Sequence, residues 1–470
     1  MSGADIPDNA RILDAPSHRL AAFALELEHD AVPAEVRRRA VLLVLDNLGA
    51  GIHGRSTRVG QIVLREASER YRSGSSAVWG TKVRLQAAGA ALANATASHA
   101  FELDDYSPPA KTHPGTVIVP TALAVAPTNT SGRELITSII AAYDVMVRVS
   151  LGINAPSARG RGFHMTGLAG PFGATAVAAR LEGLNVAQFV SAVGIAASSS
   201  SGIFAFSAEG AMTKSFHAGR AAEAGIVAVR LARAGFIGPT AGLDAPDGGL
   251  LRAVSDRSDV GQLTEELGER FEIARVATKP YPCCGSNHSS IDAVLALRGV
   301  EQLTSSDIDR IEAHNAAGVI MQCGFDYGGA GGPLEAQMSL QYCLAIALVD
   351  GSVGLRQFES DRRTAPEVLD LARRVTFVVD PQIDAIYPRE FPGRVRIFLK
   401  DGRVLERYIP SPLGAPGNSL TEQQVIAKFL DVTSGLMTER RSNQVIDAVL
   451  NLDSLKRVGD LNKQLARIGM

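Results

Sequence analysis

Titratable side chains are concentrated in residues 101–115, a short segment between two apolar stretches of the chain. The segment contains three carboxylates, a tyrosine, a lysine and a histidine, namely Glu102, Asp104, Asp105, Tyr106, Lys111 and His113. Residues 85–100 are rich in alanine and residues 117–126 are apolar, so both are expected to be buried elements. Polar loops held by rigid elements often carry functional side chains. Asp104 alone would suit a helix cap or a surface position, but so many titratable groups favour a functional loop.

Histidines and lysines also occupy four turns that lie at joints of the chain. They are Thr112-His113-Pro114, Phe163-His164-Met165, Thr213-Lys214 and Lys279-Pro280-Tyr281-Pro282. Each one taken singly has an ordinary structural explanation, such as a histidine bonded to a carbonyl or a lysine at a helix start. Together they supply two imidazoles that titrate near neutral pH and two ammonium groups. This set suits abstraction of a proton next to a carboxylate, with the cations stabilising the enolate that forms.

The motifs of other catalytic classes are absent from the sequence. The tripeptide Gly160-Arg161-Gly162 lacks the third glycine and the preceding strand of a dinucleotide-binding loop, and there is no phosphate-binding P-loop. No H-E-x-x-H zinc motif, tight Cys/His cluster or G-x-S-x-G nucleophile elbow occurs. An iron–sulfur cluster would require the neighbouring Cys283 and Cys284 to act together with Cys323, which is an unusual arrangement. We therefore expect no metal and no cofactor, and acid–base chemistry by side chains alone.

Composition limits the partners and the compartment. The 470-residue chain has a formal net charge of −2 with interspersed charges, which argues against nucleic acid as a partner. Its four cysteines form no C-x-x-C motif, as is usual in a reducing compartment. The N-terminus has neither the basic nor the apolar region of a secretory signal, and no uninterrupted apolar run reaches the roughly 18–20 residues of a membrane span. These features predict a cytoplasmic protein without a membrane partner.

The sequence predicts a mainly α fold of two domains. Up to about residue 265 almost no segment alternates as a strand would, whereas residues 311–315, 374–379 and 394–400 do, the last ending in an Asp401-Gly402 hairpin signal. A capping box at Ser419-Leu420-Thr421-Glu422 opens the terminal helices. We expect a large all-helical domain built from residues 1–268 and 406–470. A smaller α+β lid domain is expected at residues 269–405, with a flexible glycine-rich loop at Gly328–Pro333.

The chain resembles the MmgE/PrpD family, which includes 2-methylcitrate dehydratase, cis-aconitate decarboxylase and iminodisuccinate epimerase. Eight motifs carry the resemblance in order along nearly the whole chain: Leu45-Asp46-Asn47-Leu48-Gly49, Val78-Trp79-Gly80, His99 through Asp105, His113-Pro114, Gly162-Phe163-His164, Thr213-Lys214 with His217-Ala218-Gly219-Arg220, Lys279-Pro280-Tyr281-Pro282, and Lys428-Phe429. The resemblance implies a helical domain with an α+β lid. It also implies a metal-free homodimer that acts on small di- and tricarboxylates in a cleft between the domains.

The resemblance also assigns roles to residues. The family's two catalytic histidines look like His113 and His164, its active-site lysine looks like Lys214, and a lid lysine looks like Lys279. His217 and His288 are assigned to packing or to supporting positions. The full expected set is His113, His164, Lys214 and Glu102 for catalysis, and Lys279, Tyr106, Asp105 and Cys284 for substrate binding.

Three positions depart from the family pattern and leave the substrate open. Glu102 stands where an aspartate is common, Tyr106 where a threonine is common, and Cys284 where cis-aconitate decarboxylase has a histidine. We predict a cofactor-independent lyase of the dehydratase type that acts on a di- or tricarboxylate such as 2-methylcitrate. Epimerisation of an iminodisuccinate-like dicarboxylate and decarboxylation of a cis-aconitate-like acid are the alternatives. A catalytically idle carboxylate-binding protein is the alternative from another class.

Overall fold

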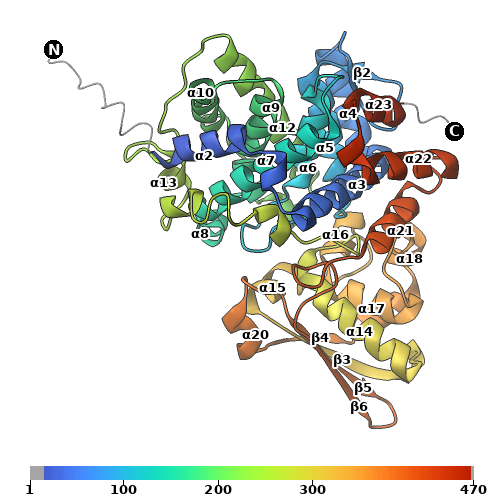
Figure 1. Ribbon diagram of the computed structural model, residues 1–470. Coiled ribbons are helices and arrows are strands. Elements are labelled where there is room, and N and C mark those ends of the chain that lie inside the picture. The colour runs from blue at the N-terminus through green and yellow to red at the C-terminus, as the bar shows by residue number, and fades with distance from the viewer. Residues whose placement is uncertain (1–14, 467–470) are drawn as a thin grey trace. The chain divides into compact units, whose positions relative to one another are not determined.

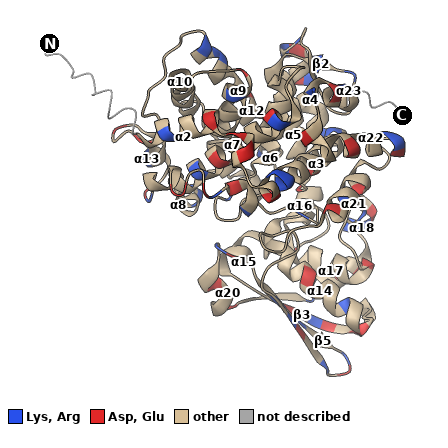
Figure 2. Ribbon diagram, viewed as in Figure 1, with Lys and Arg blue, Asp and Glu red and all other residues tan. Residues whose placement is uncertain are grey.

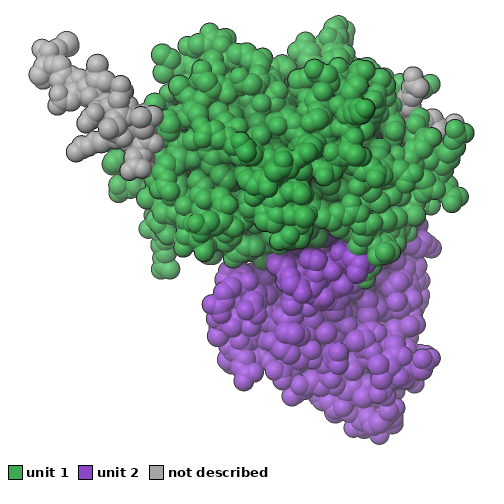
Figure 3. All heavy atoms as spheres, viewed as in Figure 1, with its two compact units in different colours: residues 1–100, 104–276, 422–470 green, residues 101–103, 277–421 purple. Residues whose placement is uncertain are grey.

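The computed structural model describes residues 15–466, apart from the side chains of Ala208 and Glu209. The expectation about a signal segment concerns the first residues of the chain, which lie outside this range. The described residues group into two compact units (Figure 3). Unit 1 contains residues 1–100, 104–276 and 422–470, and unit 2 contains residues 101–103 and 277–421. The predicted mainly helical fold is confirmed, while the predicted domain boundaries remain a prediction.

Unit 1 is built almost entirely from helices (Figure 1). Its α-helices are α2 (Pro16–Glu26), α3 (Ala34–Ser56), α4 (Arg58–Arg70), α5 (Ala87–Ser98), α6 (Gly115–Val125), α7 (Gly132–Ile153), α8 (Ala155–Gly160), α9 (Met165–Leu181), α10 (Val186–Ala197), α11 (Phe206–Glu209), α12 (Thr213–Arg233), α13 (Leu250–Val254), α21 (Glu422–Thr433), α22 (Glu439–Leu450) and α23 (Val458–Leu465). Short 3₁₀ turns are η1 (His29–Ala31), η2 (Val260–Leu263), η3 (Glu272–Arg275) and η7 (Leu452–Ser454). Two short strands, β1 (Ser76–Ala77) and β2 (Arg84–Leu85), pair antiparallel.

Small residues allow the central helices of unit 1 to pack closely. Every residue of α5 is buried, and α12 packs against both α5 and α9. A Cβ atom at Gly219 would lie 2.1 Å from Thr96 Oγ1, and one at Gly225 would lie 2.6 Å from the backbone nitrogen of Thr175. Larger side chains at these two positions would push α12 away from both neighbours. The glycines therefore fix the position of α12 and of the lysine in its first turn.

The C-terminal helices pack against the N-terminal part of unit 1. Helix α21 packs on α3, where Lys428 donates to the buried Asp46 at 2.6 Å. Burial raises the pKa of Asp46, and the Lys428 charge opposes that shift. The prediction that Asp46 anchors a helix junction agrees with this contact, because a buried carboxylate requires a charged or hydrogen-bonding partner.

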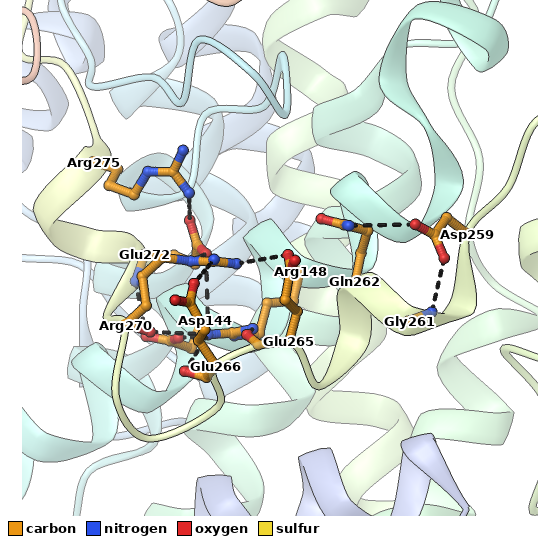
Figure 4. Close-up of polar contacts among 10 residues, drawn as sticks. All are labelled: Asp144, Arg148, Asp259, Gly261, Gln262, Glu265, Glu266, Arg270, Glu272 and Arg275. Carbon is orange, nitrogen blue, oxygen red and sulfur yellow. Dashed lines mark hydrogen bonds and ion pairs between the residues drawn. The ribbon is translucent and has the colours of Figure 1, made fainter.

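A fully buried arginine joins α7 to the end of the second segment of unit 1, residues 104–276 (Figure 4). Arg148 donates from Nε to Asp144 Oδ1 at 3.0 Å and from its Nη atoms to the carbonyls of Glu265 at 2.5 Å and Arg270 at 2.9 Å. Glu272 adds a second buried carboxylate, 4.0 Å from Arg148 Nη2. The guanidinium thus satisfies two anions and two carbonyls at once, which suits its planar set of donors.

Unit 2 combines a mixed sheet with helices. The sheet order is β4-β3-β5-β6, with β3 parallel to β4 and antiparallel to β5. The strands are β3 (Ile308–Asn315), β4 (Val375–Val379), β5 (Gly393–Leu399) and β6 (Val404–Ile409). The helices are α14 (His288–Glu301), α15 (Ala317–Cys323), α16 (Pro333–Met338), α17 (Leu340–Asp350), α18 (Ser360–Arg363), α19 (Pro366–Ala372) and α20 (Pro381–Ile386), with 3₁₀ turns η4 (Gly285–Asn287), η5 (Ser305–Asp307) and η6 (Leu355–Phe358).

The predicted strands of unit 2 are all found, each with slightly different ends. The Asp401-Gly402 signal marks the turn between β5 and β6, where Gly402 adopts a φ of +90°. Residues of β5 alternate between buried and half-buried positions, as the sequence alternation predicts. Helix α14 packs on β5, β6 and α17, and this packing encloses the apolar core of the unit.

Among the described residues, one helix is long and apolar enough to cross a membrane. This helix is α7, and 94% of its most apolar window is buried within the protein. It also carries Asp144 and Arg148 in the buried network. A core helix passes the same test of length and composition, so the property is weak evidence for a span.

Basic and acidic residues are interspersed along the helices of the chain (Figure 2).

We predict that Arg148→Met lowers the free energy of unfolding by about 3–5 kcal/mol, because it leaves Asp144 buried without its cation. Urea titration followed by circular dichroism measures this change. Arg356→Met is the matched control, because the Arg356 ion pairs with Glu359 and Asp361 are solvent-exposed. The control should leave the unfolding midpoint nearly unchanged, and equal midpoints for the two variants would contradict the role given to Arg148.

Candidate active site

One buried carboxylate contacts two histidines in unit 1. His99 Nδ1 lies 2.7 Å from Asp104 Oδ2 in a hydrogen bond, and His113 Nδ1 lies 2.8 Å from the same oxygen. His113 Nδ1 is close enough to Asp104 for an ion pair, but the two groups are not aligned for a hydrogen bond. The side chains of His99 and Asp104 have no exposed surface, and that of His113 is 15% exposed. The loop from 101 to 115 therefore does carry a cluster of titratable groups, as its composition predicts.

Electrostatics fix the protonation of His99 and Asp104. Burial lowers the pKa of His99 to about 3, despite the nearby Asp104 charge. Burial alone would raise the pKa of Asp104, but the attraction of His99 and His113 holds it well below its usual value. At neutral pH Asp104 is ionised and His99 is neutral with its proton on Nδ1. The Nε2 atom of His99 is then a lone-pair acceptor, and no described residue donates a hydrogen bond to it.

A second pair of histidines adjoins this cluster. The His99 and His164 rings are stacked with centroids 5.8 Å apart, and His164 Nδ1 lies 3.0 Å from His217 Nδ1. Burial lowers the pKa of both His164 and His217, so both rings are neutral at neutral pH. His113 and His164, which are 51 positions apart in the sequence, are thus brought to one place, with His99 contacting both rings.

Helix ends position these side chains. His99 follows the last residue of α5, His113 directly precedes the Pro114 cap of α6, and His164 caps α9. Lys214 is buried in the first turn of α12, and its charge further lowers the pKa of His99. Ser215 Oγ donates to the His99 carbonyl at 3.0 Å and joins the start of α12 to the end of α5.

The two other candidates of unit 1, Asp105 and Tyr106, have different environments. Asp105 accepts hydrogen bonds from Tyr143 at 2.8 Å and from the backbone nitrogen of Gly115 at 3.0 Å. Burial raises the pKa of Asp105 to about 7. Both of its oxygens are used inside the protein, which favours a role in holding the loop against α6. Tyr106 is buried with its ring 6.2 Å from that of His113.

Glu102 and Lys279 form an ion pair within unit 2. Lys279 Nζ donates to Glu102 Oε2 at 2.7 Å, and both side chains are almost fully buried. The charge of Lys279 is therefore already compensated by a carboxylate of this chain. A substrate carboxylate would share the ammonium with Glu102, and this bears on the binding role predicted for Lys279.

Cys284 is a buried thiol in the core of unit 2. Gln322 Nε2 donates to its sulfur at 3.5 Å. A hydrogen bond from Cys323, aided by Lys279 and Ser286, lowers the pKa of Cys284 to about 5. A thiolate at this position would repel a carboxylate, so Cys284 would be a poor ligand for a polyanion.

His99, Asp104 and His113 are also, among the described residues, the group whose atoms could reach one metal ion. Two histidines and a carboxylate suit zinc or iron by type. However, the Asp104 oxygen lies 2.7 and 2.8 Å from the two nitrogens. Ligands on a tetrahedral zinc with bonds of about 2.0 Å lie about 3.3 Å apart. The observed distances are shorter than the separation expected between two ligands of one zinc ion.

Three contributors to the site, His99, Asp104 and His217, are not in the set of acting residues that the sequence predicts. Asp104 and His99 belong to the recognised stretch from His99 to Asp105, and His217 was assigned to packing. The His99-x₄-Asp104 spacing was a usable signal, because it places both side chains at the entrance of one loop. Nothing in the sequence indicated the contact between His217 and His164, which lie 53 positions apart.

We predict that the His99 ring stays neutral between about pH 5 and 8, because its pKa lies far below the usual 6.5. Histidine-ring NMR, with His99→Gln for assignment, should show no shift of the His99 signals in that range. An unfolded histidine takes up a proton near pH 6.5, so His99 favours unfolding progressively as the pH falls below that value. A His99 titration centred near pH 6.5 would refute the assignment.

Comparison with known proteins places the chain in a family. Residues 18–263 match the MmgE/PrpD N-terminal domain, and residues 281–453 match the MmgE/PrpD C-terminal domain. The chain is 26% identical over 460 residues to cis-aconitate decarboxylase of Aspergillus terreus, covering 93% of each chain. It is 27% identical to the cis-aconitate decarboxylase-like protein oryM of Aspergillus oryzae, covering 93% of this chain and 95% of the relative. It is 28% identical to cis-aconitate decarboxylase of Homo sapiens, covering 90% of this chain and 88% of the relative. The chain therefore belongs to the MmgE/PrpD family.

Proposed function

We propose that this protein is a cofactor-independent lyase that decarboxylates a small tricarboxylate of the cis-aconitate type. One observation carries the proposal: Asp104 holds His99 and His113 with their Nε2 atoms turned away from it, next to His164. Imidazoles held in this way can transfer protons to and from carbon acids. The names of the full-length relatives favour decarboxylation among the reactions considered.

The reaction needs a proton donor and charge compensation. When a carboxylate leaves as carbon dioxide, the C–C bond electrons remain on carbon, delocalised over the adjacent double bond and carboxylate. That carbon system then takes one proton, so that one C–C bond is broken and one C–H bond is formed. His164 or His113 would supply the proton. Lys214, in the first turn of α12, would stabilise the developing negative charge together with the positive end of its helix.

Dehydration of 2-methylcitrate and epimerisation of a dicarboxylate use the same type of proton transfer. Glu102, Tyr106 and Cys284 differ from the family pattern, so they bear on which acid fits. We propose that Glu102 and Lys279 act as a pair toward the substrate and that the protein works in the cytoplasm as a homodimer. The idle carboxylate-binding alternative is disfavoured by the presence of His113, His164 and Lys214 together.

The test is an assay of purified protein with cis-aconitate, 2-methylcitrate and iminodisuccinate in heavy water, followed by proton NMR. We expect loss of a carboxylate from cis-aconitate with one deuterium built into the product. Loss of water from 2-methylcitrate alone would replace the proposal by the dehydratase. Binding of these acids without any conversion or deuterium exchange would favour the idle protein.

We predict that His164→Ala and Lys214→Ala each lower kcat by about 10²–10⁴-fold, since one loses a proton carrier and the other loses charge stabilisation. Circular dichroism should show the helical content unchanged. Initial rates for both variants near those of the unmodified protein would remove these residues from the site.

Adjacent aspartates provide a sharper test. In Asp104→Asn the negative charge beside His99 and His113 is lost, and an amide NH₂ turned toward a ring nitrogen would force that imidazole into the wrong tautomer, so kcat should fall about 10³–10⁴-fold. Asp105→Asn keeps an acceptor for Gly115 and should retain most activity. The raised pKa of Asp105 makes its ionisation unfavourable in the folded protein, so the free energy of unfolding of the wild type should decrease as the pH rises from about 4 to 7. The Asp105→Asn variant should lose less stability over the same range, because it has no carboxyl group to ionise at this position. Equal kcat values in the two variants would contradict the division of roles.

A further inference from the structure

His164 is buried and yet must exchange protons if it serves the reaction. Its side chain lies under Phe206, whose ring centroid is 5.1 Å away at an edge-on angle, and near Phe204 at 5.9 Å. The chain around it is held by two backbone hydrogen bonds, from His164 to the Gly202 carbonyl at 3.0 Å and from Phe204 to the Gly162 carbonyl at 2.7 Å. These two hydrogen bonds hold the segment that carries Phe204 and Phe206, and the two aromatic rings form an apolar cover over the His164 ring.

Arg159 stacks on the Phe204 ring of this apolar cover. Its guanidinium carbon lies 3.4 Å from the centroid of the Phe204 ring. A cation stacked on the ring keeps Phe204 in place and leaves its own charge outside the apolar layer. Water therefore has poor access to His164 from this side.

His217 is the polar contact that His164 makes among the described residues. The two Nδ1 atoms are 3.0 Å apart, and His217 is half-buried whereas His164 is fully buried. Gly202 borders the His217 ring closely, since a Cβ atom there would lie 3.3 Å from His217 Nδ1 and Cγ. The absence of a side chain at Gly202, where φ is +133°, leaves room for the ring.

One proton must lie between the two Nδ1 atoms, because a hydrogen bond needs one donor and one acceptor. Both rings are neutral, so the protonation of His164 Nε2 is tied to the tautomer of His217. If His217 carries the shared proton, His164 holds its own proton on Nε2 and can give it away. No described residue forms a hydrogen bond with His164 Nε2, which leaves that atom for a reacting group.

We propose that His217 is a relay residue that passes protons between solvent and the buried His164. The step is balanced as follows. His164 gives its Nε2 proton to the substrate carbon and takes the shared proton at Nδ1, while His217 takes one proton from water at Nε2. Afterwards both rings are again neutral, and one proton has moved from solvent to substrate. The reverse order serves a proton abstraction. This inference rests on the proposed function only for whether the proton moves from solvent to the substrate or from the substrate to solvent.

The test distinguishes a His217 that transfers protons from a His217 that only holds the His164 ring in place. In His217→Asn the side-chain amide can still donate to His164 Nδ1, but it cannot pass a proton on. We expect kcat to fall about 10²-fold with KM within about threefold. His217→Ala should fall similarly, and added imidazole should restore its kcat. His53→Asn, which replaces another half-buried histidine of unit 1, is the matched control and should keep the wild-type kcat.

A readout independent of turnover uses ring NMR with ¹⁵N-labelled histidine. The Nε2 proton of His164 should exchange with solvent at least about tenfold more slowly in His217→Asn than in the wild type. Unchanged exchange, together with wild-type kcat in His217→Asn, would overturn the relay. Slower exchange in a protein that converts none of the candidate acids would support the relay and reject the proposed function.

Discussion

The site of unit 1 depends on the ionised carboxylate of Asp104, which is fully buried. A buried carboxylate costs several kcal/mol unless partners compensate it. Here the partners are His99 and His113, and they contact the same oxygen. In the His99 ring the carboxylate thereby keeps the proton on Nδ1. The Nε2 atom of His99 is left as an acceptor, without any need for a group of high basicity.

The helices supply the rigidity that this electrostatic arrangement requires. The contributing side chains lie at the ends of α5, α6, α9 and α12, and these helices pack on one another through alanine and glycine. Short side chains let the backbones approach, so that a shift of one helix would meet its neighbour at once. The positions of the four helix ends are therefore coupled. The neighbouring Asp105 contributes by joining the loop to Tyr143 and to the start of α6.

Much of the fold could be predicted from local patterns, and part of the site could not. The strand alternation at 394–400 and the Asp401-Gly402 turn predict β5 and its hairpin, because both signals lie within a few residues. His113, His164 and Lys214 were found through family motifs. The pairing of His217 with His164 is a contact between distant segments, and no periodicity encodes it. Lys279 was predicted to face a ligand, but its internal partner Glu102 depends on how residues 101–103 join unit 2.

The Lys428–Asp46 contact also has a consequence for the order of events during synthesis. Helix α3 leaves the ribosome early, but the cation that neutralises Asp46 lies 382 positions later. Until then the nascent helix bundle keeps the Asp46 carboxylate without its hydrogen-bonded cation on the surface that α21 will cover. Residues 277–421 emerge in the interval and can form their own sheet first. Completion of the bundle is thus delayed until the polypeptide is nearly finished, and a truncated chain would expose the apolar side of α3 to chaperones and proteases.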